Sequence, residues 1–279
     1  FATVLAIIRC GAIPVLADID PQTAIIDTNS IERCLSKNTK AIMIVHLYGQ
    51  VCNIDTIINI CNKNNIHFIE DCAQAHLSKY NGKIVGGFGS FGGWSFYPTK
   101  NLGAIGDAGA ITTNNKLFAE KASSLRNYGQ TKKYHHPNIG INSRMDELQA
   151  ALLLVRLKYL DEWTQKRQKI ASYYYKNINN NKVTLLRSPN MEENHVFHLF
   201  VIMSEQRKKL QKYLERNGIS TLIHYPIPIH KQKSCLNIKT DPNGLINSER
   251  HATNCLSIPC YPNLQENDVQ HIIDSINRF

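Results

Sequence analysis

The chain has 279 residues, 43% of them hydrophobic, so it can bury a substantial core and form one large and one smaller domain. Its net charge of +10 comes from scattered Lys and Arg residues, which argues against nucleic-acid binding and favours a basic surface that attracts an anionic small molecule. No apolar run reaches the roughly 18 residues of a membrane span and the start lacks the basic region of a signal peptide, so we expect a soluble, cytoplasmic protein outside any membrane.

The first residues read as a helix followed by a strand. Residues 1–10 are a predicted helix that ends at Gly11, and residues 13–17 are strand-like. Asn29 and Glu32 resemble a capping box, which predicts a short helix from this point.

Apolar runs at residues 41–45 and 66–69 are typical of buried parallel strands. Residues 54–62 between them have the periodicity of a helix. This alternation predicts βαβ units and therefore an α/β fold with a mostly parallel sheet.

Turn and strand signals continue the pattern. An Asn-Gly pair at residues 81–82 predicts a tight hairpin beside the sheet. The aromatic run at 94–97 predicts a buried strand that ends at Pro98, because proline cannot donate to a strand ladder. Residues 108–113 predict the next strand and residues 116–126 a helix.

A long helix is predicted from Ser143, capped by Ser143 and Asp146 in an S-x-x-D pattern, and we expect it to lead into a second domain. Apolar residues recur along it at helical spacing and predict a packing stripe: Met145, Leu148, Leu152, Val155 and Tyr159. Asparagines at 177–181 are turn formers that end a neighbouring helix.

The remainder of the chain predicts a small α+β domain. It has strand patterns at 195–202 and 220–224, helical patterns at 205–216 and 266–277, and a looser stretch at 230–247. We therefore expect a large α/β domain over residues 1–155, and a connector helix with a small C-terminal domain over residues 156–279.

The eight cysteines form no paired C-x-x-C clusters and lie mostly in apolar segments, which is typical of reduced core cysteines. We expect neither a disulfide framework nor zinc, and we assign no metal site.

Lys100 lies just past the predicted aromatic strand, between Pro98 and two glycines, Gly103 and Gly106. Glycine lets the backbone turn sharply and approach a bound group closely. An ammonium group in such surroundings is desolvated, which lowers its pKa and favours the neutral amine, a nucleophile able to form a Schiff base. The alternative is a lysine that points to water, as most lysines after strands do.

Asp71 ends another apolar strand, within HFIEDCAQAH at residues 67–76. In α/β proteins, ligands bind at the carboxyl ends of parallel strands. A lysine at one strand end and an aspartate at another match the protein groups that pyridoxal phosphate requires: a Schiff-base amine and a carboxylate that keeps the pyridine nitrogen protonated. Asp71 is also in position to be a helix N-cap, and both roles are compatible.

Four segments resemble the DegT/DnrJ/StrS family of sugar aminotransferases, which has aminotransferase fold type I. They are EDCAQAH (70–76), SFYPTKNLG (95–103), GINSRMDELQAA (140–151) and HYPIP (224–228), so the resemblance covers essentially the whole chain. It implies a mixed, mostly parallel sheet flanked by helices, with residues 1–155 as the cofactor-binding domain. It also implies a PLP-dependent transaminase of deoxysugar and glycan or lipopolysaccharide biosynthesis.

The resemblance implies that pyridoxal 5'-phosphate forms its Schiff base with Lys100, the catalytic residue, while Asp71 contacts the ring nitrogen. It places Gln74 at the ring oxygen and Ser95 at the phosphate. Asn142 corresponds to a residue that reaches the cofactor phosphate of the neighbouring subunit, which implies a homodimer with a shared active site. Without the resemblance, Gln74 is an ordinary loop residue, Ser95 an isolated strand serine and Asn142 a turn asparagine.

Residues 224–228, together with Tyr97, resemble the family members that act on dTDP-3-keto-6-deoxyhexoses as 3-aminotransferases, with glutamate as the implied amino donor. Tyr97, His224 and Tyr225 offer polar tips that suit sugar hydroxyls. The alternative substrate is a 4-keto nucleotide sugar, and the alternative role of His224 and Tyr225 is ring packing. A neighbouring branch that dehydrates its substrate carries histidine instead of the lysine, so Lys100 argues against that branch.

The chain starts at Phe1 rather than at a methionine, and the family has an upstream segment that supplies part of the sheet and a phosphate-binding turn. We therefore expect an N-terminal truncation. The rival hypotheses are a catalytically incomplete fragment and a regulatory or interaction protein on the same fold.

Overall fold

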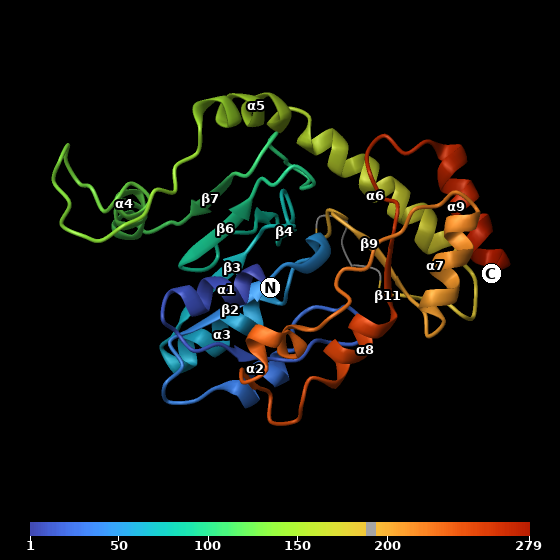
Figure 1. Ribbon diagram of the computed structural model, residues 1–279, viewed down its shortest axis with the longest axis horizontal. Coiled ribbons are helices and arrows are strands. Elements are labelled where there is room, and N and C mark those ends of the chain that lie inside the picture. Colours follow the sequence, from blue (N-terminus) through green and yellow to red (C-terminus); the bar gives the residue numbers. More distant parts are fainter. Residues whose placement is uncertain (188–193) are drawn as a thin grey trace.

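The computed structural model describes residues 1–187 and 194–279, and a four-stranded sheet lies near its centre (Figure 1). In spatial order its strands are β2 (Ala41–Val45), β3 (His67–Asp71), β6 (Phe91–Ser95) and β7 (Gly109–Thr112). The first three strands are parallel, and β7 pairs with β6 in the antiparallel direction. The sheet is therefore mixed and mostly parallel, as the apolar runs predict.

Helices α1 (Ala2–Arg9) and α3 (Ile54–Asn64) confirm the two helices predicted at the start of the chain. Apolar side chains from α3, β2 and β3 share one buried cluster, which includes Ile42, Ile44, Ile54, Ile57 and Phe68. This burial holds α3 against the sheet and thereby fixes the position of β3, whose last residue is Asp71.

The cap of α2 (Thr28–Cys34) differs from the prediction at Asn29 and Glu32. The N-cap is Asp27, whose carboxylate accepts from the backbone N–H groups of Asn29 and Ser30. An aspartate directly before the helix satisfies the first free N–H groups, so the helix begins two residues earlier than the capping box implies.

The predicted hairpin is confirmed. Asn81 and Gly82 join β4 (Lys79–Tyr80) to β5 (Lys83–Ile84), which pair in the antiparallel direction. Both turn residues have positive φ, 49° and 76°, the conformation that an Asn-Gly hairpin turn requires.

The strand before Lys100 ends two residues earlier than predicted and begins three residues earlier. β6 ends at Ser95, and Tyr97 is 50% exposed rather than buried in the sheet. The backbone N–H of Ala104 donates to the Phe96 carbonyl at 2.7 Å, so the chain turns back on itself at this point. Loop closure, rather than Pro98 alone, ends the strand.

The strand predicted at 108–113 and the helix predicted at 116–126 are confirmed as β7 and α4 (Lys116–Leu125). Figure 1 shows α4 and the loop after it projecting beyond the sheet before the chain returns to α5. We call residues 126–146 the arm.

The long helix predicted from Ser143 is two helices, α5 (Glu147–Leu157) and α6 (Leu160–Asn177). Asp146 is the N-cap residue of α5, whereas the Ser143 N–H donates to the Arg126 carbonyl at 2.8 Å, so Ser143 closes the arm instead of capping a helix. The end of α6 agrees with the predicted turn at 177–181.

The packing stripe predicted on this helix is wrong for most of its members. Leu148, Val155 and Tyr159 are 66%, 54% and 50% exposed. The buried residue of α5 is Leu153, which clusters with Leu102 beside Lys100. The helix therefore turns a different face to the core and leaves apolar side chains uncovered in the single chain.

The C-terminal part has an antiparallel sheet with strand order β11 (Cys255–Ile258), β9 (Phe200–Met203) and β8 (Thr184–Leu185). It also contains α7 (Arg207–Arg216), α8 (Ile246–Asn254) and α9 (Glu266–Arg278). The helices predicted at 205–216 and 266–277 are confirmed, and the α+β character with them. β11 and α8 were not predicted, because four residues and a polar nine-residue helix carry little periodicity.

Two strand predictions in this part are corrected. The strand expected from His195 begins only at Phe200, because Phe197 has a φ of 45° that an extended strand excludes. The strand expected at 220–224 is reduced to one bridge between Leu222 and Ser257.

The division at residue 155 stays a prediction. A second buried cluster, with Tyr174, Ile202, Leu210, Leu256 and Ile273, is separate from the cluster around β2 and β3 and supports it. However, β1 (Val15–Leu16) pairs in parallel with β10 (Lys239–Thr240), so the first residues and the last third of the chain are also joined directly.

Across residues 1–187 and 194–279, no helix has both the length and the apolar character that crossing a bilayer requires.

Candidate active site

Asp71 is the last residue of β3, and both of its carboxylate oxygens accept hydrogen bonds. Thr3 Oγ1 on α1 donates to Oδ2 at 2.7 Å, and the Ala73 backbone N–H donates to Oδ1 at 3.1 Å. The two donors hold the carboxylate in one orientation. The next regular element is β4, so Asp71 begins a turn and is not a helix N-cap.

Lys100 lies in the closed loop that follows β6. Its backbone N–H donates to the Tyr97 carbonyl at 2.9 Å. A Cβ at Gly103 would lie 2.4 Å from the Pro98 carbonyl oxygen, so only glycine fits there without a shift of the backbone. Glycine is therefore required after the lysine because the loop approaches its own backbone closely, whereas the sequence predicted a close approach to a bound group.

The Lys100 side chain is half-buried and lies close enough to Asp71 to respond to its charge. Burial lowers the pKa of the Lys100 ammonium group, and the Asp71 carboxylate opposes this only in part. No residue in the described ranges makes a hydrogen bond or ion pair with this ammonium group. The amine and the carboxylate are therefore neighbours that are not paired.

Histidines lie near the Lys100 charge. Burial first, and then the Lys100 charge, lowers the pKa of His76 to about 4. The same two causes lower the pKa values of His198 and His224. Neutral rings add no further positive charge beside the amine. His76 is the last residue of the EDCAQAH motif, and the sequence assigned it no role. Nothing in the sequence pattern indicated His198.

Gln74 is held from both ends of its amide. The Tyr48 N–H donates to Oε1 at 2.6 Å, and Nε2 lies 3.4 Å from the Tyr225 hydroxyl. His224 is fixed by a contact of 2.8 Å between Nδ1 and Ser257 Oγ. The structure thus brings Tyr225, one of the predicted sugar-binding residues, to Gln74, while the adjacent His224 side chain contacts Ser257.

Asn101, directly after Lys100, is a buried residue that sequence reasoning missed. Its Nδ2 donates to the Val196 carbonyl at 3.2 Å, and its Oδ1 lies 3.1 Å from His198 Nδ1. These contacts anchor the lysine loop to the segment before β9. The only sequence signal for this role was an asparagine inside an apolar loop.

Three other predicted site residues lie outside this contact set. Ser95 Oγ accepts from the Tyr97 N–H at 3.3 Å, and Tyr97 makes no hydrogen bond to His224 or Tyr225. Asn142 lies on the arm, where its Oδ1 accepts from Arg144 Nε at 3.1 Å and its backbone bridges to Asn127. Within the described residues of one chain, no hydrogen bond joins Asn142 to Lys100.

The donor set fits pyridoxal 5'-phosphate. Asp71 would hold the ring nitrogen and Lys100 the aldehyde carbon, since the first is an oriented carboxylate and the second an unpaired amine. Gln74 Nε2 would hold the ring oxygen, because its present contact of 3.4 Å is long and easily exchanged for a ligand.

Comparison with known proteins agrees with this geometry. The sequence model of the DegT/DnrJ/EryC1/StrS aminotransferase family matches residues 1–277. The "dTDP-3-amino-3,6-dideoxy-alpha-D-galactopyranose transaminase" of Aneurinibacillus thermoaerophilus is 46% identical over 280 residues, which span 100% of this chain and 76% of the relative. The "Pleiotropic regulatory protein" of Geobacillus stearothermophilus is 41% identical over 281 residues, with the same coverage of 100% and 76%.

A solved structure extends the comparison to the fold. The crystal structure of S. venezuelae DesV in complex with a ketimine intermediate superposes with a TM-score of 0.93 at 35% identity, covering 98% of this chain and 74% of that one. Aminotransferase fold type I, expected from the sequence resemblance, is confirmed.

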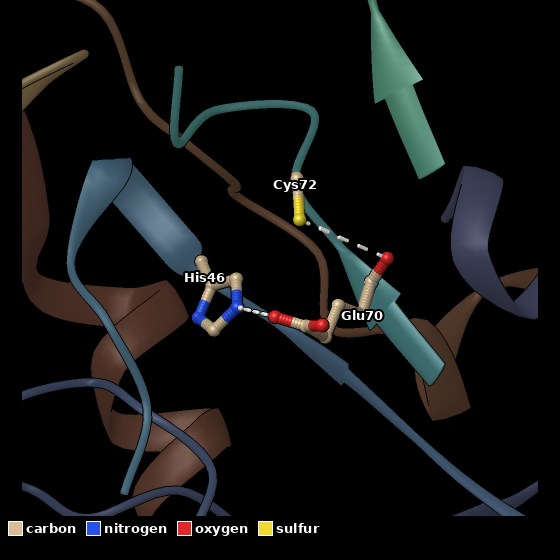
Figure 2. Close-up of side chains that lie close together, drawn as sticks. All are labelled: His46, Glu70 and Cys72. Atoms are coloured by element: carbon tan, nitrogen blue, oxygen red, sulfur yellow. Dashed lines mark hydrogen bonds and ion pairs between the residues drawn. The ribbon is translucent and has the colours of Figure 1, made fainter. Parts of the chain in front are cut away.

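His46, Glu70 and Cys72 lie together beside the site and carry groups of the kind that bind metals (Figure 2). Figure 2 shows the Glu70 carboxylate directed at the His46 ring, with His46 Nε2 3.3 Å from Glu70 Oε2. His46 Nδ1 accepts from the Cys52 N–H at 3.2 Å, so Nε2 carries the proton and donates to Glu70. Both ring nitrogens are therefore already used within the protein.

The fully buried Glu70 carboxylate also accepts from the backbone N–H groups of Gly86, Phe88 and Gly89, at 2.8, 2.8 and 2.9 Å. Burial raises the pKa of Glu70, but the hydrogen bonds from His46, Gly86 and Gly89 outweigh it and lower the pKa below its usual value. We interpret the cluster as a structural anchor that fixes the end of β3, one residue before Asp71.

Replacing Glu70 by glutamine (Glu70→Gln) is expected to destabilise the protein by about 3 kcal/mol, because one oxygen is replaced by an NH₂ group that faces backbone donors. Urea unfolding measures the loss. The matched control is Glu32→Gln on the exposed surface of α2, expected to change stability by less than about 0.5 kcal/mol. Equal stabilities of the two variants would contradict the anchor role.

Proposed function

This chain belongs to the DegT/DnrJ/EryC1/StrS aminotransferase family, and we propose that it binds pyridoxal 5'-phosphate and aminates a nucleotide-linked keto sugar. The amino group comes from an amino acid, glutamate, and the acceptor is the 3-keto group of a dTDP-3-keto-6-deoxyhexose. The observation that carries the proposal is the half-buried Lys100 amine, which lies near the Asp71 charge and is paired with no described carboxylate.

Lys100 is the residue that moves protons. When bound, pyridoxal phosphate supplies an electron sink for the carbon next to the transferred nitrogen. With the cofactor bound, Lys100 would hold its aldehyde carbon. The Lys100 Nζ would also be the group that takes a proton from the amino-donor carbon and gives one to the sugar carbon. Burial of Lys100 favours the neutral amine, which is the form that accepts a proton.

The remaining cofactor residues orient the ring. Asp71 keeps the proton on the ring nitrogen, and its hydrogen bonds from Thr3 and Ala73 leave the carboxylate little freedom to turn away. Gln74 donates from Nε2 to the ring oxygen, and the Ser95 hydroxyl donates to the phosphate.

The sugar site is assigned to Tyr97, His224 and Tyr225. The contact between Tyr225 and Gln74 supports a sugar ring that lies next to the cofactor. The name of the 46% identical relative, a dTDP-3-amino sugar transaminase, supports a dTDP-linked substrate with nitrogen at the 3-position.

The site is completed by a second copy of the chain. Asn142 lies on the arm and makes no hydrogen bond to Lys100 of its own chain, which suits a role at the cofactor phosphate of a partner subunit. The arm and α5 expose large apolar side chains that a second copy would cover: Tyr134, Ile139, Ile141, Leu148 and Leu154.

A regulatory protein on the same fold is the second candidate, because a 41% identical relative carries the name of a pleiotropic regulatory protein. Such a protein would not need an unpaired amine at position 100 with an oriented carboxylate nearby. The Lys100 chemistry therefore separates the two candidates.

Borohydride reduction of the protein loaded with pyridoxal phosphate is expected to leave a stable covalent adduct on Lys100, located by peptide mass mapping. Lys100→Ala should lose the adduct and about 10²- to 10⁴-fold of the amino-transfer rate, because the proton carrier is gone. Lys83→Ala, on the exposed hairpin, is the matched control and should retain both.

Absence of an adduct, both in residues 1–279 and after an upstream segment has been added to them, would reject the enzyme and leave the regulatory candidate. An adduct that forms only after an upstream segment has been added would identify this chain as a catalytically incomplete piece.

With glutamate as donor, we expect kcat/KM for a dTDP-3-keto-6-deoxyhexose to exceed that for a 4-keto nucleotide sugar by at least about tenfold. The keto group of the 4-keto sugar lies one ring carbon away from the position at which the amine would react. Chromatography of the amino-sugar products measures both rates. A preference for the 4-keto compound would overturn the assignment of the 3-position and leave the transaminase itself intact.

Co-expression of Lys100→Ala with Asn142→Ala is expected to restore about a quarter of wild-type activity, although each variant alone is inactive or nearly so. Half of the dimers are mixed, and each mixed dimer has one site with an intact Lys100 and an intact partner Asn142. No recovery in purified mixed dimers would show that Asn142 serves its own chain or neither.

A further inference from the structure

Tyr48 is a buried residue that the mechanism above does not use. It lies in a 3-10 turn, η1 (Leu47–Gly49), directly after β2, and is only 2% exposed. Its φ of 63° is in the left-handed region, which a tyrosine adopts only when its surroundings impose it. Strained backbone of this kind at the carboxyl end of a parallel strand is typical of residues with a functional role.

The backbone of Tyr48 orients Gln74. Its N–H donates to Gln74 Oε1 at 2.6 Å. A glutamine amide has one acceptor oxygen and one donor nitrogen, so this bond decides that Nε2 faces Tyr225. The η1 turn is also in close contact with the backbone of Gln74, because a Cβ at Gly49 would lie only 2.9 Å from the Gln74 carbonyl oxygen.

The side chain of Tyr48 holds the opposite wall of the site. Its hydroxyl donates to the His224 backbone carbonyl and lies 2.9 Å from His251 Nε2. Because the hydroxyl proton is used on the carbonyl, His251 donates its Nε2–H to the Tyr48 oxygen. Burial lowers the pKa of His251 to about 4, so this ring is neutral at pH 7 and suited to that role.

We propose that Tyr48 is a positioning residue that couples the Gln74 amide to the segment carrying His224 and Tyr225. One residue thereby sets both the orientation of a cofactor contact and the place of the sugar contacts. The meaning of these contacts rests on the proposed function, whereas the coupling itself is a property of the fold.

Tyr48→Phe tests the coupling, since it removes the hydroxyl and keeps the ring and the backbone N–H. The matched control is Tyr174→Phe, because the fully buried Tyr174 hydroxyl likewise donates to a backbone carbonyl, that of Pro259 at 2.7 Å, within the C-terminal core. Both variants lose one buried hydrogen bond of the same kind. Thermal unfolding of the two provides a common scale for general destabilisation.

In spectral titrations, Tyr48→Phe should bind pyridoxal phosphate within about twofold of wild type, because Gln74 keeps its backbone partner. Its Kd for the dTDP-sugar, measured by calorimetry, should rise about tenfold, and KM should rise with little change in kcat. In a Tyr225→Phe background, the same change should weaken sugar binding by less than about threefold, because Tyr48 acts through that segment.

Amide hydrogen exchange in the cofactor-free protein gives a readout that does not depend on activity. Exchange over residues 221–228 should be about tenfold faster in Tyr48→Phe and unchanged in Tyr174→Phe. Equal exchange and equal sugar affinity in the two variants would overturn the inference. A wild type that binds neither cofactor nor sugar would instead reject the proposed function, and the exchange result would still decide the coupling.

Discussion

The candidate site depends on the desolvation of one amine. Lys100 is half-buried near Asp71 but forms no ion pair with a described residue, so its pKa is lowered instead of being raised by a close carboxylate. A contact ion pair would keep the amine protonated, and full exposure would restore its ordinary pKa. Full exposure is prevented because the loop is closed on itself at Gly103 and Asn101 anchors it to the segment before β9. An ion pair is disfavoured because the Asp71 carboxylate already accepts hydrogen bonds from Thr3 and Ala73.

Segments far apart in the chain build the surroundings of that amine. The end of β3 supplies Asp71 and is itself fixed by the buried Glu70, whose carboxylate gathers backbone N–H groups from the loop at 86–89. The turn after β2 and the segment at 224–225 then meet at Gln74. Each of these contacts satisfies a buried polar group, so displacing one segment would leave unpaired donors or acceptors in its neighbours.

In contrast to these satisfied polar groups, α5 and the arm expose apolar side chains that nothing in the single chain covers within the described residues. Ile139 is 100% exposed and Leu148 66%, although residues of this kind are usually buried. The same helix does bury Leu153 against the loop that carries Lys100, so one side of α5 supports the site and the other side is free for a second copy. This arrangement places the proposed interface on the helix that packs against the loop carrying Lys100.

The sequence by itself determined most regular elements of the first half and the family, because apolar periodicity, an Asn-Gly turn and short motifs are local properties of the chain. It also predicted the chemical type of the site. It misassigned the capping residues of α2 and α5, the stripe on α5 and the strand at 220–224, since these depend on which competing donor or face meets the rest of the protein. Only the tertiary structure brought Tyr225 to Gln74 and placed Thr3 on Asp71. These facts join residues tens to hundreds of positions apart, and no local pattern records a contact whose energy exists only after the chain has folded.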